Sequence, residues 1–141
     1  AKIPAGDESL AALKLVSEAM IRYAAGQTGD AESLAKRTLV EDRFNDVALL
    51  LLGVIELGDG RNQEALKHLK LASETTAKNH AMTRLYLVRA EMKTGNLADA
   101  KRQVQDLVDQ EPTLVQAQYT QAMIARADHL EAQATDELKR S

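Results

Sequence analysis

Three glycines recur along the chain at an almost constant interval, and this spacing constrains the fold more than any other feature. Gly26, Gly60 and Gly95 are 34 and 35 residues apart, and a further 34 residues reach His129. We call these four sites the marker positions. Each is followed five residues later by an alanine: Ala31, Ala65, Ala100 and Ala134. A fixed period of this length is typical of a solenoid, in which stacked copies of a small unit bury a shared core.

The composition indicates that the repeating element is an α-helix. Hydrophobic residues make up 45% of the chain and charged residues 28%, while only 3% are aromatic. Ala, Leu, Glu, Gln and Lys are abundant, and all five are good helix formers. No β-branched run shows the period-2 alternation of a strand. We therefore expect an all-α chain of eight helices, with first helices at about 8–24, 46–57, 81–93 and 114–127 and second helices at about 31–40, 63–75, 97–109 and 130–139.

The residues around the marker positions predict where these helices begin and end. Glycines punctuate helical patterns, so we expect turns at 26–29, 58–61, around Gly95 and at 128–129. Asn62 and Asn96 are predicted to cap the helices that follow two of the turns. Pro112 is predicted to end the helix before it. Such short turns force the paired helices to run antiparallel.

These residues resemble the tetratricopeptide repeat, a helix–turn–helix unit of 34 residues. The best match spans 81–114 and rests on Leu87, Val88, Gly95, Ala100, Val104, Leu107 and Pro112. The resemblance implies a right-handed α-solenoid of about four antiparallel helix pairs. It would form one domain over 1–141, with units at about 12–45, 46–80, 81–114 and 115–141. The last unit departs from the family pattern, because His129 stands where glycine is usual.

In this family the first helices line a concave face, and the resemblance implies that this face takes the ligand. The positions that would point inward lie thirteen, ten, six and three residues before each marker position, and most are apolar. We define the inward stripe as Met20, Tyr23, Val47, Leu50, Val54, Leu57, Met82, Leu85, Arg89, Met92, Tyr119, Met123 and Arg126. Leu13, Val16 and Gln116 share the same spacing. The stripe contains all four methionines of the chain, and methionine adapts cheaply to varied partners.

The inward stripe predicts a partner-binding groove for an apolar helix or an extended segment of another protein. Arg89 and Arg126 would orient that segment. Family members that hold the acidic tails of heat-shock chaperones use Lys and Asn on this face. Here the corresponding positions include Val16, Met20 and Leu50, so an acidic tail is not expected.

An alternative remains open at this point. Superhelical curvature, or association between copies of the chain, would bury the stripe as ordinary core, and the protein would then be a structural self-association module. The final helix, 130–139, is expected to cap the stack with its polar side outward.

The sequence offers no catalytic, metal or cofactor site. The chain has no cysteine, and His68, His80 and His129 have no ligand-type residue four positions later. A net charge of −3 carries no polyelectrolyte signal, and the sequence shows no basic face of the kind that nucleic-acid binding needs. The longest apolar run, 47–55, is too short to insert into a membrane. We therefore predict that the protein is a scaffold or adaptor and not an enzyme. By analogy, its setting would be bacterial envelope, secretion or organelle-assembly machinery.

The sequence leaves the compartment open between cytoplasm and periplasm, because an absence of cysteine is compatible with both. The chain begins at Ala1 rather than at a methionine, as expected of a mature form or an excised fragment.

Overall fold

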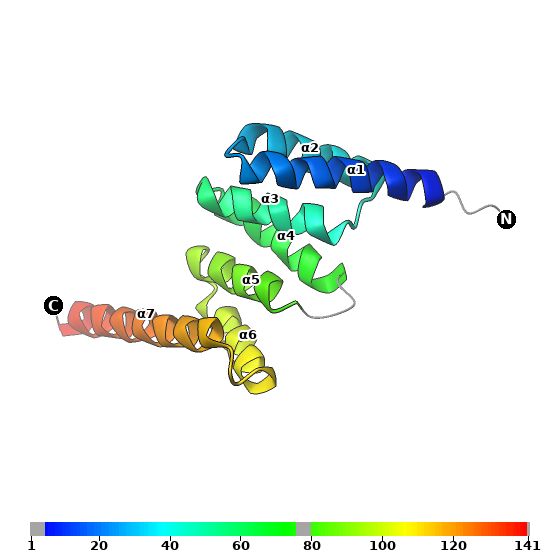
Figure 1. Ribbon diagram of the computed structural model, residues 1–141. Coiled ribbons are helices and arrows are strands. Elements are labelled where there is room, and N and C mark those ends of the chain that lie inside the picture. Colours follow the sequence, from blue (N-terminus) through cyan, green and yellow to red (C-terminus); the bar gives the residue numbers. More distant parts are fainter. Residues whose placement is uncertain (1–4, 76–79, 141) are drawn as a thin grey trace.

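The computed structural model describes residues 5–75 and 80–140, which form seven α-helices and no strand. The helices are α1 (Ala5–Ala24), α2 (Thr28–Glu41), α3 (Asp46–Gly58), α4 (Asn62–Thr75), α5 (Ala81–Lys93), α6 (Leu97–Gln110) and α7 (Val115–Arg140). Each helix packs against the next along the chain. The first helices α1, α3, α5 and α7 follow one another down the molecule (Figure 1). The prediction of an all-α solenoid is therefore confirmed.

The first three helix pairs turn at the predicted glycines. Gly26, Gly60 and Gly95 have φ angles of +81°, +79° and +83°, a left-handed conformation that glycine adopts without steric cost. The N–H after each glycine donates to the carbonyl five residues earlier, with N···O distances of 2.7–2.8 Å. These bonds satisfy the last carbonyls of the first helix and reverse the chain direction.

The fourth marker position does not turn the chain, so the prediction of an eighth helix is wrong. His129 lies inside α7, which runs unbroken from Val115 to Arg140. The left-handed conformation costs a residue with a side chain about 1–2 kcal/mol, so the chain continues as a helix through His129. The expected helices 114–127 and 130–139 are thus one helix, and the expected turn at 128–129 is absent.

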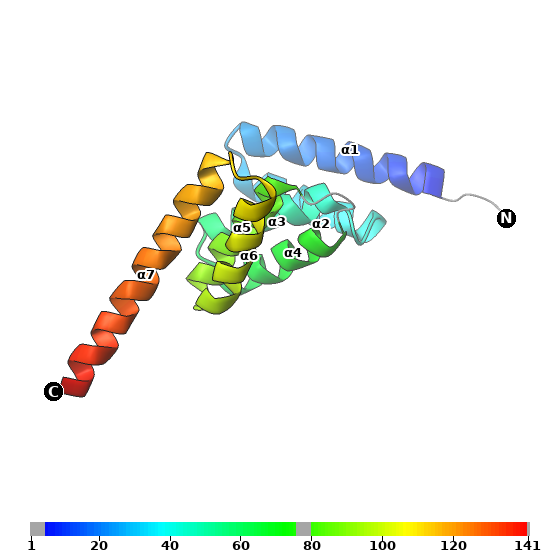
Figure 2. The same ribbon diagram turned by 90° about the horizontal axis from the view of Figure 1, so that it is seen from below.

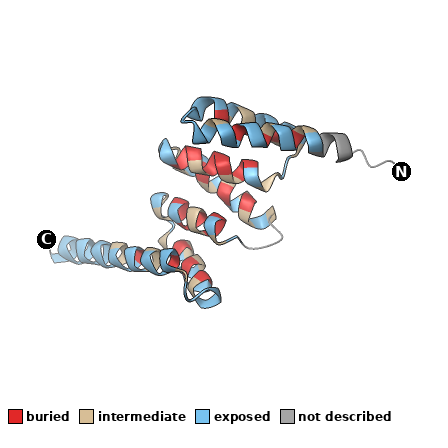
Figure 3. Cartoon of the chain, viewed as in Figure 1, coloured by how far each residue is buried: buried red, intermediate tan, exposed pale blue. Residues whose placement is uncertain are grey.

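The second half of α7 extends beyond the rest of the stack (Figure 2). Every side chain from His129 to Arg140 is exposed, as the colouring of Figure 3 shows. The prediction that 130–139 caps its own stack is therefore wrong for this structure, because that segment covers no apolar surface of its own chain.

The core lies between the two helices of each pair and between neighbouring pairs (Figure 3). The alanines that follow the first three marker positions are fully buried: Ala31, Ala65 and Ala100. Leu69 and Leu87 pack in one core cluster with Ala65, and Val88, Val104 and Ile124 pack in another with Ala100. Small residues therefore occupy the closest helix contacts, as the repeat pattern predicts.

Substituting leucine for Ala65 or Ala100 is expected to destabilise the fold by about 1–3 kcal/mol, because the added methylene and methyl groups have no space to enter. Ala132→Leu is the matched control, since Ala132 is exposed on α7 and its change should stay within about 0.5 kcal/mol. Urea unfolding measures all three. Parent-like midpoints for both buried sites would show that these alanines are not at tight helix contacts.

The predicted helix caps are corrected at two positions. The side chain of Asn96, the residue before α6, donates to Thr94 Oγ1 at 2.8 Å and caps no helix N–H. Asn62 lies within α4, and its Oδ1 atom is buried without a hydrogen-bond partner. Asn45 does cap a helix, because its Oδ1 accepts from the Ala48 N–H of α3 at 2.9 Å.

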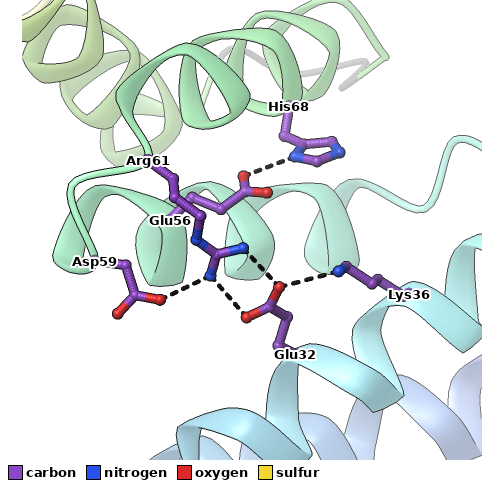
Figure 4. A network of polar contacts seen from close by, with 6 residues as sticks. All are labelled: Glu32, Lys36, Glu56, Asp59, Arg61 and His68. Carbon is purple, nitrogen blue, oxygen red and sulfur yellow. Dashed lines mark hydrogen bonds and ion pairs between the residues drawn. The ribbon is translucent and has the colours of Figure 1, made fainter.

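A polar network joins the first helix pair to the second (Figure 4). The Glu32 carboxylate on α2 accepts two hydrogen bonds from the Arg61 guanidinium, at 2.7 and 2.8 Å. Lys36 and Asp59 extend the network through ion pairs of 3.1 Å with Glu32 and 2.8 Å with Arg61. Hydrogen bonding to Arg61 lowers the pKa of Glu32 from 4.5 to about 2. Such a bidentate pair holds the relative position of two repeats with defined geometry.

This pair predicts a pH dependence of stability. Because the pKa of Glu32 is lower in the folded state, the stabilisation is complete above the unfolded value and is lost as the pH falls from about 4.5 to about 2. Arg61→Gln should therefore be less stable than the parent at pH 7, and the difference should shrink on acidification. Urea unfolding at several pH values tests this. A difference that stays constant down to pH about 2 would contradict it.

Candidate functional site

A groove of about 500 Å³ lies between α5 and α7. Its lining residues are Met82, Leu85, Tyr86, Arg89, Met92 and Lys93 from α5 and Gln116, Tyr119, Thr120 and Met123 from α7. Met82, Tyr119 and Met123 are 51%, 66% and 45% exposed. The groove is therefore an open surface with mainly apolar walls.

Helical spacing places the groove residues on one face of each helix. Residues three or four positions apart lie on the same side, which aligns Met82, Leu85 and Arg89 along α5. The other side of α5 carries Leu87 and Val88, both fully buried. On α7, Tyr119 and Met123 face the groove, while Ala117 and Ile124 are buried. Contact between α5 and α7 brings the two exposed faces together.

The groove has a cationic side. The Arg89 guanidinium carbon lies 5.4 Å from the centroid of the Tyr86 ring, within the range of a cation–π interaction. Lys93 lies one helical turn further along α5. None of the residues that line the groove is acidic. An anionic group of a ligand would therefore be favoured beside these two side chains.

The structure brings together six members of the inward stripe in this groove: Met82, Leu85, Arg89, Met92, Tyr119 and Met123. Gln116, which shares the stripe spacing, also lines it. Arg126 is exposed on α7 but does not line the groove, so it is not placed beside Arg89 as expected.

The stripe residues on α1 and α3 lie outside the groove. Met20, Tyr23 and Val47 are exposed, and Leu50 and Val54 are half-buried. Leu57 is only 8% exposed and packs in the core with Leu69 and Leu87. The expectation that Leu57 lines an open face is therefore corrected: the third helix pair covers it.

Sequence reasoning missed three residues that line the groove, namely Tyr86, Lys93 and Thr120. Each stands one position after a residue with the stripe spacing: Leu85, Met92 and Tyr119. A surface groove is wider than a single row of side chains. Including the next residue along each helix would have found all three.

None of the residues that line this groove is a histidine, an aspartate or a glutamate. No group of three or more His, Asp or Glu residues in that part of the chain could hold a metal ion. His68 Nδ1 lies 2.7 Å from the Glu56 carboxylate, between α4 and α3 (Figure 4). Burial raises the pKa of Glu91, whose carboxylate accepts from Gln103 Nε2 at 3.4 Å. Neither pair lines the groove.

None of the helices described in residues 5–75 and 80–140 combines sufficient length with sufficient apolar character to cross a bilayer.

Comparison with known proteins identifies the family. Residues 57–124 match the sequence model of the tetratricopeptide repeat, and solved tetratricopeptide domains superpose on most of the chain. Residues 57–124 belong to the tetratricopeptide repeat family, and the chain as a whole has a tetratricopeptide-like fold. No curated protein sequence matches the chain.

Three solved structures illustrate the likeness. The first tetratricopeptide domain of Spaghetti (RPAP3), bound to an HSP90 peptide, is 18% identical with a TM-score of 0.77, over 84% of this chain and 94% of that one. MamA is 18% identical with a TM-score of 0.76, over 91% and 74%. The type III secretion chaperone SycD of Yersinia enterocolitica, in complex with a peptide of the translocator YopD, is 19% identical with a TM-score of 0.69, over 82% and 92%. At sequence identities of 18–19%, these structural similarities show that the chain shares the fold of these proteins.

Proposed function

We propose that this tetratricopeptide protein is a scaffold or adaptor that binds an apolar helix or extended segment of a partner protein in the groove between α5 and α7. The observation that carries the proposal is the exposure of Met82, Tyr119 and Met123 around one groove of about 500 Å³. An apolar surface of this kind is costly to leave in water. Methionine side chains adjust to the shape of a ligand, and amphipathic segments bind such grooves through regularly spaced apolar residues.

The peptide complexes of two neighbours support binding of a segment by this fold. Spaghetti (RPAP3) holds an HSP90 peptide, and SycD holds a peptide of YopD. SycD also supports the proposed setting, an assembly such as secretion or envelope machinery in a bacterium. The proposal assigns the chain no catalytic role, since members of this family act through the partners they bind.

The charge of the groove suggests how the segment is oriented. Arg89 and Lys93 lie on α5 at the groove wall. A carboxylate of the partner, or the negative end of a partner helix, would bind there through charge-assisted hydrogen bonds. This places the anionic end of the ligand next to Arg89 and its apolar residues against the methionines.

Apolar residues on α1 and α3, outside the groove, also distinguish this chain from neighbours with acidic ligands. The HSP90 peptide bound by Spaghetti is SRMEEVD, which carries three acidic side chains. Here Met20 is exposed and apolar, Leu50 is half-buried and Val16 is buried. An acidic tail would meet few cations along these positions, so an apolar segment fits better.

Selection of random 16-residue peptides on the immobilised protein tests the proposal. We expect enrichment of Leu, Ile, Met or Phe at helical spacing, with a carboxylate near one end. The synthetic peptide SRMEEVD is the comparison ligand, and its dissociation constant should be at least about tenfold weaker, or 1.4 kcal/mol. Enrichment of acidic peptides without spaced apolar residues would refute the proposal.

A further inference from the structure

Residues 129–140 of α7 have the spacing of a second repeat helix, but every one of their side chains is exposed. In the three preceding pairs, the residues five and nine positions after the marker are buried: Ala31 and Ala35, Ala65 and Leu69, Ala100 and Val104. The corresponding residues of the fourth unit are Ala134 and Leu138. Both are exposed, Leu138 by 77%. This segment therefore has an apolar face of the usual pattern that covers no surface of its own chain.

The surface that such a helix would cover is also vacant. A cleft of about 450 Å³ lies between α6 and α7, and its walls include Ala98, Lys101 and Gln105 on α6 and Gln121 and Ala125 on α7. None of the residues that line this cleft lines the groove between α5 and α7. The cleft is thus a separate surface, and its occupation does not depend on the proposed function.

The earlier repeats show which residues meet when the second helix is in place. In the second pair, a Cβ atom added to Gly53 would lie 2.4 Å from Leu69 Cγ, so the position seven before the marker touches the position nine after it. The corresponding residues of the fourth unit are Ala122 and Leu138. In an unbroken α7 they are about 24 Å apart, at 1.5 Å per residue. One chain with a straight α7 cannot make this contact.

We propose that two copies of the chain exchange these segments, so that residues 130–140 of each copy pack as the missing second helix in the α6–α7 cleft of the other. The occupant is a second copy because the segment has the spacing of this chain's own second helices, and the vacant cleft follows this chain's own third repeat. The exchange is reciprocal, which gives a closed two-fold dimer. Leu138 would become buried, while Asp136, on nearly the opposite face of α7, would stay in water.

Disulfide trapping in the full chain tests the exchange, because the parent has no cysteine. The variant Ala122→Cys with Leu138→Cys is mixed as ¹⁴N- and ¹⁵N-labelled protein and then oxidised. We expect a disulfide-linked dimer in which the peptide joining positions 122 and 138 contains both isotopes. Light scattering should show the parent as a dimer at about 100 μM, a concentration well above a micromolar dissociation constant.

The matched control moves one cysteine to the other face of α7. Ala122→Cys with Asp136→Cys should yield at most about a tenth of the dimer, because position 136 points away from the cleft of the other copy. A disulfide between 122 and 138 of one isotope only would mean that the segment folds back within its own chain. That result, equal yields from the two variants, or a monomeric parent would overturn the exchange.

A second variant tests the role of the fourth marker position. His129→Gly permits the left-handed turn that the other three markers make, so the segment can fill the cleft of its own chain. We expect the dissociation constant of the dimer to rise by at least about tenfold, because packing of the segment within its own chain would compete with exchange between two chains. An unchanged dimer in His129→Gly would count against exchange at this hinge.

Discussion

Replacing Met82 with glutamate is expected to weaken binding of a groove-selected apolar peptide by about 30-fold or more, while the folded protein stays nearly as stable as the parent. Met82 is 51% exposed in the groove wall, so a carboxylate there remains hydrated when the groove is empty. A bound peptide would cover that charge without a partner, at a cost of about 2 kcal/mol or more. Isothermal titration and thermal melting measure the two effects separately.

Two further variants make this result decisive. Val40→Glu is the control for binding, because Val40 is 80% exposed on α2 and lies outside the groove, so peptide affinity should not change. Leu50→Glu is the control for stability. Leu50 is half-buried against the core cluster that contains Leu57 and Leu69, and a charge placed against that cluster should cost about 1–3 kcal/mol.

A large loss of stability in Met82→Glu would show that the proposed groove is part of the core. Unchanged affinity in a stable Met82→Glu protein would show that the selected peptide binds elsewhere. The sequence alone assigned Leu50 and Met82 to the same stripe. The structure separates them, and these two melts therefore test the structure as well as the function.

Gly53→Ala is expected to destabilise the fold by about 2–3 kcal/mol, although alanine is the better helix former by about 1 kcal/mol. An added Cβ would lie 2.4 Å from Leu69 Cγ and 2.5 Å from Leu69 Cδ2. Leu69 is fully buried, so it cannot move aside without shifting α4. Guanidinium or urea unfolding measures the change in the free energy of unfolding.

The same substitution five residues later is the matched control. Gly58 lies at the end of α3, and a Cβ added there would meet no atom within 4 Å. Gly58→Ala should therefore be neutral or stabilising, by up to about 1 kcal/mol. Leu69→Ala should partly rescue Gly53→Ala, so that the double variant loses at least about 1 kcal/mol less than the sum of the single losses. Equal effects at Gly53 and Gly58 would contradict the close approach of α3 and α4.

The helices and the first three turns were predictable from the sequence because local chemistry decides them. Gly26, Gly60 and Gly95 turn the chain since each adopts a positive φ angle that other residues avoid. Ala65 and Ala100 mark helix contacts because only a small side chain fits where two helices approach closely. The family pattern combines these two constraints, and it recurs often enough in 141 residues to be recognised.

The tertiary structure decided which apolar residues are core and which are open. Leu57 and Met82 have the same period and the same polarity, yet the third helix pair covers Leu57 and leaves Met82 in the groove wall. Periodicity reports the face of a helix, but exposure depends on what stacks against that face. The pairing of Glu32 with Arg61 likewise joins residues of different repeats, and no local pattern encodes it.

Helix α7 of the fourth unit shows both what the sequence determines and what only the tertiary structure decides. The sequence by itself predicted two helices here, at 114–127 and 130–139, and determined that Ala134 and Leu138 have the spacing of a buried face. Only the tertiary structure decided that α7 continues through His129, and that these two residues have no partner in their own chain to cover them. The physical reason is that the left-handed turn costs a histidine about 1–2 kcal/mol. Whether packing offsets that cost depends on the whole surface that the segment contacts.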